Sequence, residues 1–506
     1  MLFSSTDFIF AFLPVVLGGY ILITYFDKRI LVFGWLVLCS LFFYTYWDPP
    51  FVLLLILSIS INYLIGNILL KDRSKKFLIA GIVFNLGLIG IFKYFSFFVS
   101  TINLIFPTSL IQPSIILPLA ISFFTFQQIA YLVDTYKGNI KDTNLLQYTF
   151  FDSFFPQLIA GPIVRYGEII SQFSNRQTDS LTASNFLTGT IIFIIGLQKK
   201  LVLADGIGVH ADGFFSNLAG QDPTLIESWI GTLAYTFQIY FDFSGYSDMA
   251  IGLSRIFGIK LPENFNSPYK ATNIIEFWRR WHMTLSRFLR DYLYIPCGGN
   301  RKGPGRHYTN IMITMLLGGL WHGAAWTFVF WGGLHGLFLV INHLWRAGRE
   351  LLRQDLGQSS PVGQIVSRTI TLLAIIFAWV FFRAESWSDA LSVIQGMIGL
   401  NGVLLPTSWT PLNNEELRLL SKYSIYFVEK LPYQSDILIN LVILGFIVLA
   451  FPNTRKLITI FSQSRTCYGV STKILVTATV IVFTCISLLI VLARGFETNN
   501  FIYMVF

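Results

Sequence analysis

Histidine is the side chain best suited to acid–base chemistry near neutral pH, and this chain carries six of them: His210, His282, His307, His322, His335 and His343. His322 follows Trp321 in a glycine-rich apolar run, 316–326. Burying an ionisable group in an apolar segment is costly, and small residues let a helix or a ligand approach closely. We interpret His322 as a candidate general base; the alternative is a histidine hydrogen-bonded between helices.

His282 lies in a run of aromatic and basic residues, 277–286. If this run is helical, Arg279, His282 and Ser286 share one face, and Trp278 and Trp281 flank it. A ligand-contacting histidine is one interpretation of this pattern. An amphipathic segment at a membrane interface is the other.

Other catalytic signatures are missing from the sequence. It contains no Gly-x-Ser-x-Gly elbow, no Walker A loop and no Cys-x-x-Cys pair. His282 and His322 have no third ligand at a recognisable spacing, so we predict no metal. Asp242 and Asp248, six apart between apolar stretches, could position a histidine, but we expect them to cap a broken helix.

Composition places these residues in a membrane. Hydrophobic residues make up 54% of the 506 and charged residues only 12%, about half of the roughly 25% charge of a soluble domain. This excludes a soluble globular enzyme and a disordered chain. The fold class predicted is an all-α, polytopic membrane protein.

About a dozen transmembrane and re-entrant helices are expected, because a span needs about 20 mostly apolar residues. The candidate spans are 8–26, 30–46, 51–70, 77–99, 114–134, 186–204, 228–241, 311–321, 325–345, 369–383, 434–452 and 474–493. Two shorter apolar stretches, 146–164 and 245–258, are predicted to be partial or re-entrant.

The distribution of Lys and Arg in short connections predicts the orientation. The connections at 27–29 and 71–76 are basic, whereas 47–50 and 100–113 carry no base. The connections at 346–368 and 455–473 are also basic, whereas 385–436 carries six acids and three bases. We therefore expect both termini outside the cytoplasm and 385–433 as an external loop.

Residues 253–307 carry ten bases and three acids, a net charge of +7 out of +9 for the whole chain. A cytoplasmic loop explains the sign of this charge, and an amphipathic or re-entrant helix explains the accompanying aromatic residues. Such a basic surface could hold an anionic ligand such as a nucleotide-bearing acyl carrier. No nucleic-acid partner is expected, since no nucleic-acid-binding motif accompanies the charge.

Several of these runs resemble the membrane-bound O-acyltransferases, and most closely the bacterial branch typified by the alginate O-acetylation membrane protein. The matching runs are 121–127, 155–162, 240–250, 262–269, 277–286, 318–323 and the tail Phe501-Ile502-Tyr503, whereas Met504-Val505 departs from the usual pattern. The resemblance covers about residues 90–345 and the tail.

The resemblance implies helices around a central funnel, with His322 as the catalytic histidine and His282 as the second functional histidine. It implies acetyl-CoA or another acyl thioester as a co-substrate that enters from the cytoplasm, with no bound cofactor. Residues expected to bind the donor are Arg279, Arg280, Trp278, Trp281 and Ser286. Residues expected to shape the site are Asp242, Asp248, Trp321, Gly323 and Asn264.

In the alginate-type branch, acetyl passes across the cytoplasmic (inner) membrane to an extracytoplasmic acyltransferase that modifies a polysaccharide. We expect such a partner, membrane lipid around the helices, and docking at 385–433 or at Asn499–Phe506. Transfer of D-alanine to a wall polymer stays open, as do a secondary transporter or flippase and an inert scaffold. One membrane domain, 1–506, is expected, with N-terminal helices at 1–110, a catalytic core at 115–345 and C-terminal helices at 346–506.

Overall fold

Long apolar helices dominate the fold, as the sequence predicts. The computed structural model describes residues 1–26, 28–106, 108–174, 182–218, 220–355, 360–407, 414–428, 436–467 and 489. Seven helical segments within these ranges are long and apolar enough to cross a membrane. They are Asp7–Thr24, Arg29–Trp47, Pro49–Lys71, Lys75–Ile105, Ala183–Ser216, Trp326–Leu351 and Pro361–Arg383. A bent pair, Asp436–Ala450 with Thr454–Ile460, meets at 61° and would make an eighth.

The N-terminal part consists of helical hairpins whose outer faces carry exposed Leu, Ile, Val and Phe, as lipid-facing surfaces do. Its elements are η1 (Asp7–Phe12), α1 (Leu13–Thr24), α2 (Arg29–Trp47), η2 (Pro49–Phe51), α3 (Val52–Lys71), α4 (Lys75–Ile89), η3 (Gly90–Tyr94) and α5 (Phe95–Ile105). η3 is a π-helical turn that continues α4 into α5.

The central part surrounds one very long helix, α12. Its elements are α6 (Ile121–Lys137), α7 (Leu145–Ser153), α8 (Phe155–Leu158), α9 (Tyr166–Ser174), α10 (Ala183–Gln198), η5 (Lys199–Ala204), α11 (Asp205–Ser216) and α12 (Leu225–Ile256). α10 and α12 cross where glycines meet. A Cβ on Gly196 would lie 2.6 Å from the carbonyl oxygen of Gly245, and one on Gly252 would lie 2.6 Å from that of Gly189. Small residues therefore allow the two backbones into contact.

The C-terminal part begins with short helices and includes a small unit of two strands and one helix before its last two helices. Its elements are η6 (Pro268–Lys270), α13 (Ile274–Trp278), α14 (Met283–Leu289), η7 (Arg290–Tyr294), α15 (Gly303–His322), α16 (Trp326–Leu351), α17 (Pro361–Arg383), α18 (Trp387–Met397), α19 (Asn414–Ser421), α20 (Asp436–Ala450) and α21 (Thr454–Cys467). Two short strands, β1 (Val403–Pro406) and β2 (Ile425–Val428), pair in parallel with Val403 opposite Ile425.

Three predicted boundaries differ from the structure. The stretches 228–241 and 245–258 are parts of one helix, α12. The span predicted at 114–134 begins only at Ile121, after an extended approach. The stretch 146–164 holds two short helices, α7 and α8. The predicted span 474–493 lies outside the described residues except for residue 489.

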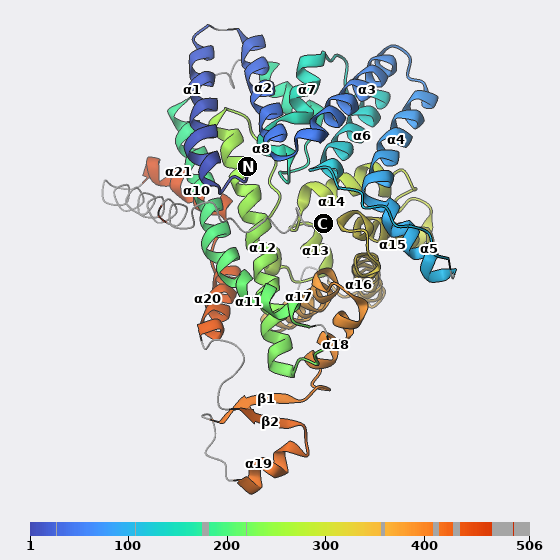
Figure 1. Ribbon diagram of the computed structural model, residues 1–506, viewed down its shortest axis with the longest axis vertical. Coiled ribbons are helices and arrows are strands. Elements are labelled where there is room, and N and C mark those ends of the chain that lie inside the picture. The colour runs from blue at the N-terminus through green and yellow to red at the C-terminus, as the bar shows by residue number, and fades with distance from the viewer. Residues whose placement is uncertain are drawn as a thin grey trace.

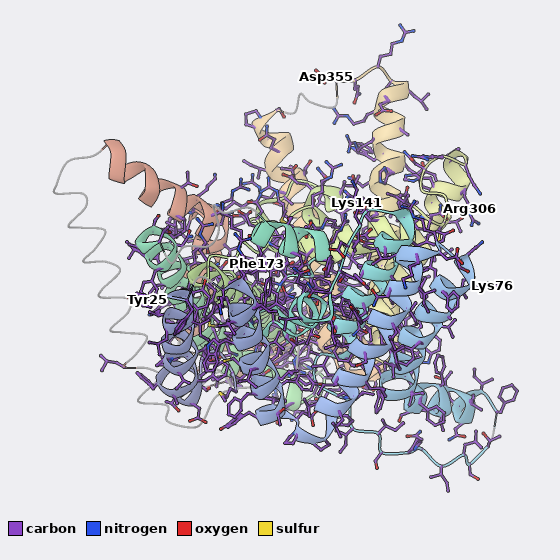
Figure 2. The ribbon with its side chains drawn as sticks, turned by 90° about the horizontal axis from the view of Figure 1, so that it is seen from above. Tyr25, Lys76, Lys141, Phe173, Arg306 and Asp355 are labelled. Carbon is purple, nitrogen blue, oxygen red and sulfur yellow. The ribbon has the colours of Figure 1, made fainter. Side chains whose placement is uncertain are left out.

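The connections between helices differ in charge between the two ends of the molecule. The basic α1–α2 and α3–α4 connections lie together at one end, and β1, β2 and α19 extend from the other (Figure 1). Tyr25, Lys76 and Lys141 mark connections in the view from above (Figure 2). This arrangement agrees with the alternation of basic and non-basic connections along the sequence.

Candidate active site

His282 lies in a break between two short helices. α13 ends at Trp278, α14 begins at Met283, and His282 adopts the left-handed conformation with φ 41° and ψ 54°. The predicted shared helical face of Arg279, His282 and Ser286 is therefore absent, because the chain turns between them. A left-handed conformation is unfavourable for a residue with a Cβ and persists where surrounding contacts enforce it, often at functional sites. The side chain of His282 is fully buried.

Asn264 supplies those contacts. Its Oδ1 lies 3.0 Å from Nδ1 of His282 and accepts hydrogen bonds from the backbone N–H (3.3 Å) and the hydroxyl (2.9 Å) of Thr284. Its backbone carbonyl accepts from the N–H of Met283 at 2.9 Å, and its Nδ2 donates to Ser247 at 3.2 Å. Because the amide oxygen only accepts, Nδ1 of His282 carries the hydrogen and Nε2 presents its lone pair.

His322 is the last residue of α15 and is almost completely buried. Gly323 follows it in an extended conformation and leads into α16. A Cβ on Gly323 would lie 2.2 Å from the ring of Phe328. Glycines also permit α15 and α16 to touch, since a Cβ on Gly319 would lie 2.3 Å from the carbonyl oxygen of Phe328. The glycine-rich sequence is thus what allows this tight hairpin.

Folding brings the two histidines to the same aromatic cluster. The ring of Trp321 lies 5.0 Å from that of His322 and 6.2 Å from that of His282, measured between ring centroids. Trp331 and Phe382 lie 5.1 and 5.2 Å from His322. Two imidazoles that are far apart in the sequence therefore share one buried, largely apolar site.

Trp278 and Trp281, which the sequence predicts to bind the donor, contact different residues from each other. Trp278 donates to Nδ1 of His335 at 3.3 Å and packs on Trp331 at 5.9 Å. This hydrogen bond joins α13 to α16. Trp281 is buried between Phe277 and Trp379, with ring centroids at 5.6 and 5.0 Å.

The two predicted site-shaping aspartates lie within α12, form ion pairs with lysines of η5 and do not cap a helix. Asp242 lies 2.8 Å from Lys200, which also contacts Asp205 at 2.8 Å. Asp248 lies 2.6 Å from Lys199. Charges in a membrane require partners, and these lysines provide them, so α12 continues without a break. The pairs tie η5 to α12, and Phe243, the neighbour of Asp242, packs on His282 at 4.7 Å.

Arg280 and Ser286 are engaged locally. Arg280 lies 2.6 Å from Glu276 and donates to the carbonyl of Asn266 at 3.3 Å. Burial alone would raise the pKa of Glu276, but hydrogen bonds from Thr272 and the charge of Arg280 hold it below its ordinary value. The Ser286 hydroxyl donates to the carbonyl of Trp281 at 3.4 Å.

Arg279 is exposed and lines a cavity of about 410 Å³ between α13, α16 and α17. The other lining residues are Thr272, Asn273, Ile275, Glu276, Asn342, Trp345, Arg346, Arg349, Gln364 and Ser367. The side chains of Arg279 and Arg346 make no hydrogen bond or ion pair with the part of the chain that the structure describes. The cavity therefore presents two uncommitted guanidinium groups to a ligand.

Two residues near His322 were not singled out from the sequence. Lys93 donates to the carbonyls of Trp321 at 2.6 Å and His322 at 3.3 Å. Tyr94 donates to the carbonyl of Leu320 at 2.8 Å. A lone lysine within an apolar run was a usable signal, because such a charge is rarely accidental. Within the described ranges, no group of three or more His, Cys, Asp or Glu side chains could hold a metal ion.

The sequence matches one family model and is similar to several named acyltransferases. The model of the membrane-bound O-acyltransferase family matches residues 135–383. A peptidoglycan O-acetyltransferase of Helicobacter pylori is 45% identical over 80% of this chain and 81% of its own length. A probable alginate O-acetylase of Pseudomonas aeruginosa is 42% identical over 78% of this chain and 75% of its own. A teichoic acid D-alanyltransferase of Streptococcus thermophilus is 32% identical over 47% of this chain and 59% of its own.

Proposed function

Since this chain belongs to the membrane-bound O-acyltransferase family, we propose that it moves an acetyl group from a cytoplasmic thioester toward an extracytoplasmic polysaccharide. O-Acyl transfer itself follows from the family and from the relatives named as O-acetyltransferases. Acetyl is favoured over D-alanine because the D-alanyltransferase matches only 47% of the chain. The acceptor is a polymer of the alginate or peptidoglycan kind, reached directly or through a partner acyltransferase.

The observation that carries this proposal is the meeting of His282 and His322 at Trp321. His322 takes the proton of an acceptor hydroxyl, and the oxygen attacks the thioester carbonyl carbon. The carbon–sulfur bond then breaks, and the leaving thiolate takes the proton from His322. The products are an ester and a free thiol.

His282 has a different role in this scheme. A neutral imidazole whose Nδ1 hydrogen is held by Asn264 can only accept a hydrogen bond at Nε2. To polarise a substrate carbonyl, His282 would have to donate a hydrogen bond. To hold an N–H or O–H group of a substrate, it has to accept one. The Asn264 contact therefore favours substrate orientation by His282.

Replacement of His322 tests the reaction. Purified protein in nanodiscs is given radiolabelled acetyl-CoA with membrane extract as acceptor source. We expect His322→Ala to abolish transfer of label and His282→Ala to reduce it, while both variants insert normally. His210→Ala, a histidine on α11 away from the site, is the matched control and keeps full activity. Turnover retained by His322→Ala would rule out this assignment of the base.

We place the phosphate groups of the donor in the cavity at Arg279 and Arg346. Trp331, His335, Asn342 and Arg346 recur at helical spacing, so they follow one face of α16. That face runs for about 22 Å, at about 1.5 Å per residue, from a ring beside His322 to the cavity. We propose that an extended thioester arm covers this distance, which requires the buried side chains of Trp331 and His335 to move aside.

Charge removal at the cavity tests this donor site. Arg279→Gln and Arg346→Gln should each raise KM for acetyl-CoA by about tenfold, the size of one charge-assisted hydrogen bond, with little change in kcat. Arg301→Gln, an exposed arginine outside the cavity lining, is the control. If KM is the same in all three variants, the basic segment is a topology signal alone.

The partner acyltransferase is proposed to dock at the opposite end. Helix α18 and the β1–β2–α19 unit lie at that end, and the unit extends beyond the helical body (Figure 1), which supports a role in docking. The other proposed docking segment, Asn499–Phe506, lies outside the described residues.

A further inference from the structure

The end of α15 is fastened by the side chains of two consecutive residues from a distant helix. Lys93 and Tyr94 together bind the carbonyls of residues 320, 321 and 322. The Lys93 ammonium also lies 5.8 Å from the centroid of the Trp321 ring. Both residues belong to the π-helical turn η3, which interrupts the long run Lys75–Ile105.

The last carbonyls of a helix have no partner within that helix, and inside a membrane water does not readily replace one. α15 ends abruptly at His322 because Gly323 is extended. Its terminal carbonyls therefore need donors from elsewhere, and a lysine also opposes the partial negative charge of a helix C-terminus. Lys93 meets both needs at the backbone of His322 itself.

Lys93 and Tyr94 both lie in the π-helical turn. Such turns are rare and occur frequently at functional sites. After η3, α5 packs against the far side of the same turn, where the ring centroids of Phe97 and Trp326 lie 5.5 Å apart. The α15–α16 turn that carries His322 is thus held by one segment of the N-terminal helices.

We propose that Lys93, assisted by Tyr94, is a positioning residue that sets the orientation of His322 for acyl transfer. This inference rests on the proposed function, because it takes His322 as the base. Lys93 acts through the backbone of His322 and contacts no reacting atom. Its loss displaces the imidazole and leaves the donor cavity at Arg279 and Arg346 unchanged.

The test compares kcat and KM for acetyl-CoA in nanodiscs among four variants. Lys93→Met removes the charge and the donors at similar length, and should lower kcat by about tenfold to a hundredfold, as small misplacements of catalytic groups do. KM should stay within about twofold, since binding is separate from the misplaced base. Lys93→Arg keeps charge and donors and should recover activity relative to Lys93→Met. Tyr94→Phe should lower kcat by a smaller factor.

Tyr44→Phe is the matched control, because Tyr44 donates to the carbonyl of Leu119 at 3.0 Å in a similar bond away from His322. Unchanged kcat in Lys93→Met would overturn the inference, as would a raised KM with kcat preserved. If Lys93→Met does not fold, Tyr94→Phe decides it, because an unchanged kcat in that variant would overturn the inference. His322→Ala, measured in parallel, separates the two proposals. Activity in His322→Ala refutes the base and with it the positioning role, whereas an inactive His322→Ala beside an unchanged kcat in Lys93→Met refutes the positioning role alone.

Discussion

Asn264 holds one nitrogen of the His282 imidazole and so fixes the orientation of the ring. One amide oxygen holds Nδ1 of the imidazole and both donors of Thr284, so it fixes the ring and the first turn of α14 together. The hydroxyl of Thr284 in turn accepts from the N–H of Ile163 at 3.0 Å, which ties the break to a further segment of the chain. At this scale, the site is a histidine in an unfavourable conformation that its neighbours enforce.

Substitution at Asn264 tests this arrangement. Asn264→Ala leaves the buried donors of His282 and Thr284 without their acceptor, at about 1–3 kcal/mol each. We expect kcat for acetyl transfer to fall by about tenfold or more. Ser247→Ala is the control, because it removes only the weaker contact to Nδ2 of Asn264. Equal activity in the two variants would contradict the holding role of Asn264.

The α15–α16 hairpin is the element that presents His322. Its two helices touch at Gly319 and Gly332, where no side chain fits. A Cβ on Gly332 would lie 2.2 Å from the carbonyl oxygen of Met315, whereas one on Gly333 would lie 3.4 Å from a methyl group of Leu316. Close backbone approach in a membrane gains van der Waals contact that bulkier residues prevent.

These two adjacent glycines give a matched pair of substitutions. Gly332→Ala forces the helices apart and should destabilise the protein by about 1–3 kcal/mol, with a marked loss of activity. Gly333→Ala meets only the end of a flexible side chain and should be close to neutral. Thermal unfolding in detergent and acetyl transfer measure both effects. If Gly332→Ala is as stable and active as Gly333→Ala, the close crossing is not required.

The whole molecule separates a basic end from an end without basic connections. Connections α1–α2 and α3–α4 lie at one end, and β1, β2 and α19 extend from the other (Figure 1). The cavity at Arg279 and Arg346 is part of the most basic region of the chain. The positive-inside rule predicts that the end with the basic α1–α2 and α3–α4 connections faces the cytoplasm.

Labelling with a membrane-impermeant thiol reagent tests this orientation. In a variant without the four native cysteines, Glu416→Cys on α19 should react in intact cells. Lys76→Cys should react only after the membrane is permeabilised. The opposite pattern would reverse the chain in the membrane and place the donor cavity outside.

The sequence by itself determined the class of protein and most of its helices, and it singled out His282 and His322 as candidates for the site. Apolar runs and charge bias are local properties, so each can be recognised without knowing what packs where. It did not reveal that 228–241 and 245–258 are one helix, because the lysines that neutralise Asp242 and Asp248 lie more than 40 residues earlier.

Only the tertiary structure decided how the site is assembled. Three contacts between distant segments build it. His282 and His322 pack on the same Trp321 ring, Asn264 binds the His282 imidazole, and Lys93 binds the last carbonyls of α15. No periodicity in the chain encodes such contacts, since they depend on how buried helices cross. The sequence predicts one helical face over 279–286, but the structure has a break there. The hydrogen bonds of Asn264 hold His282 in its left-handed conformation, which a continuous helix does not contain.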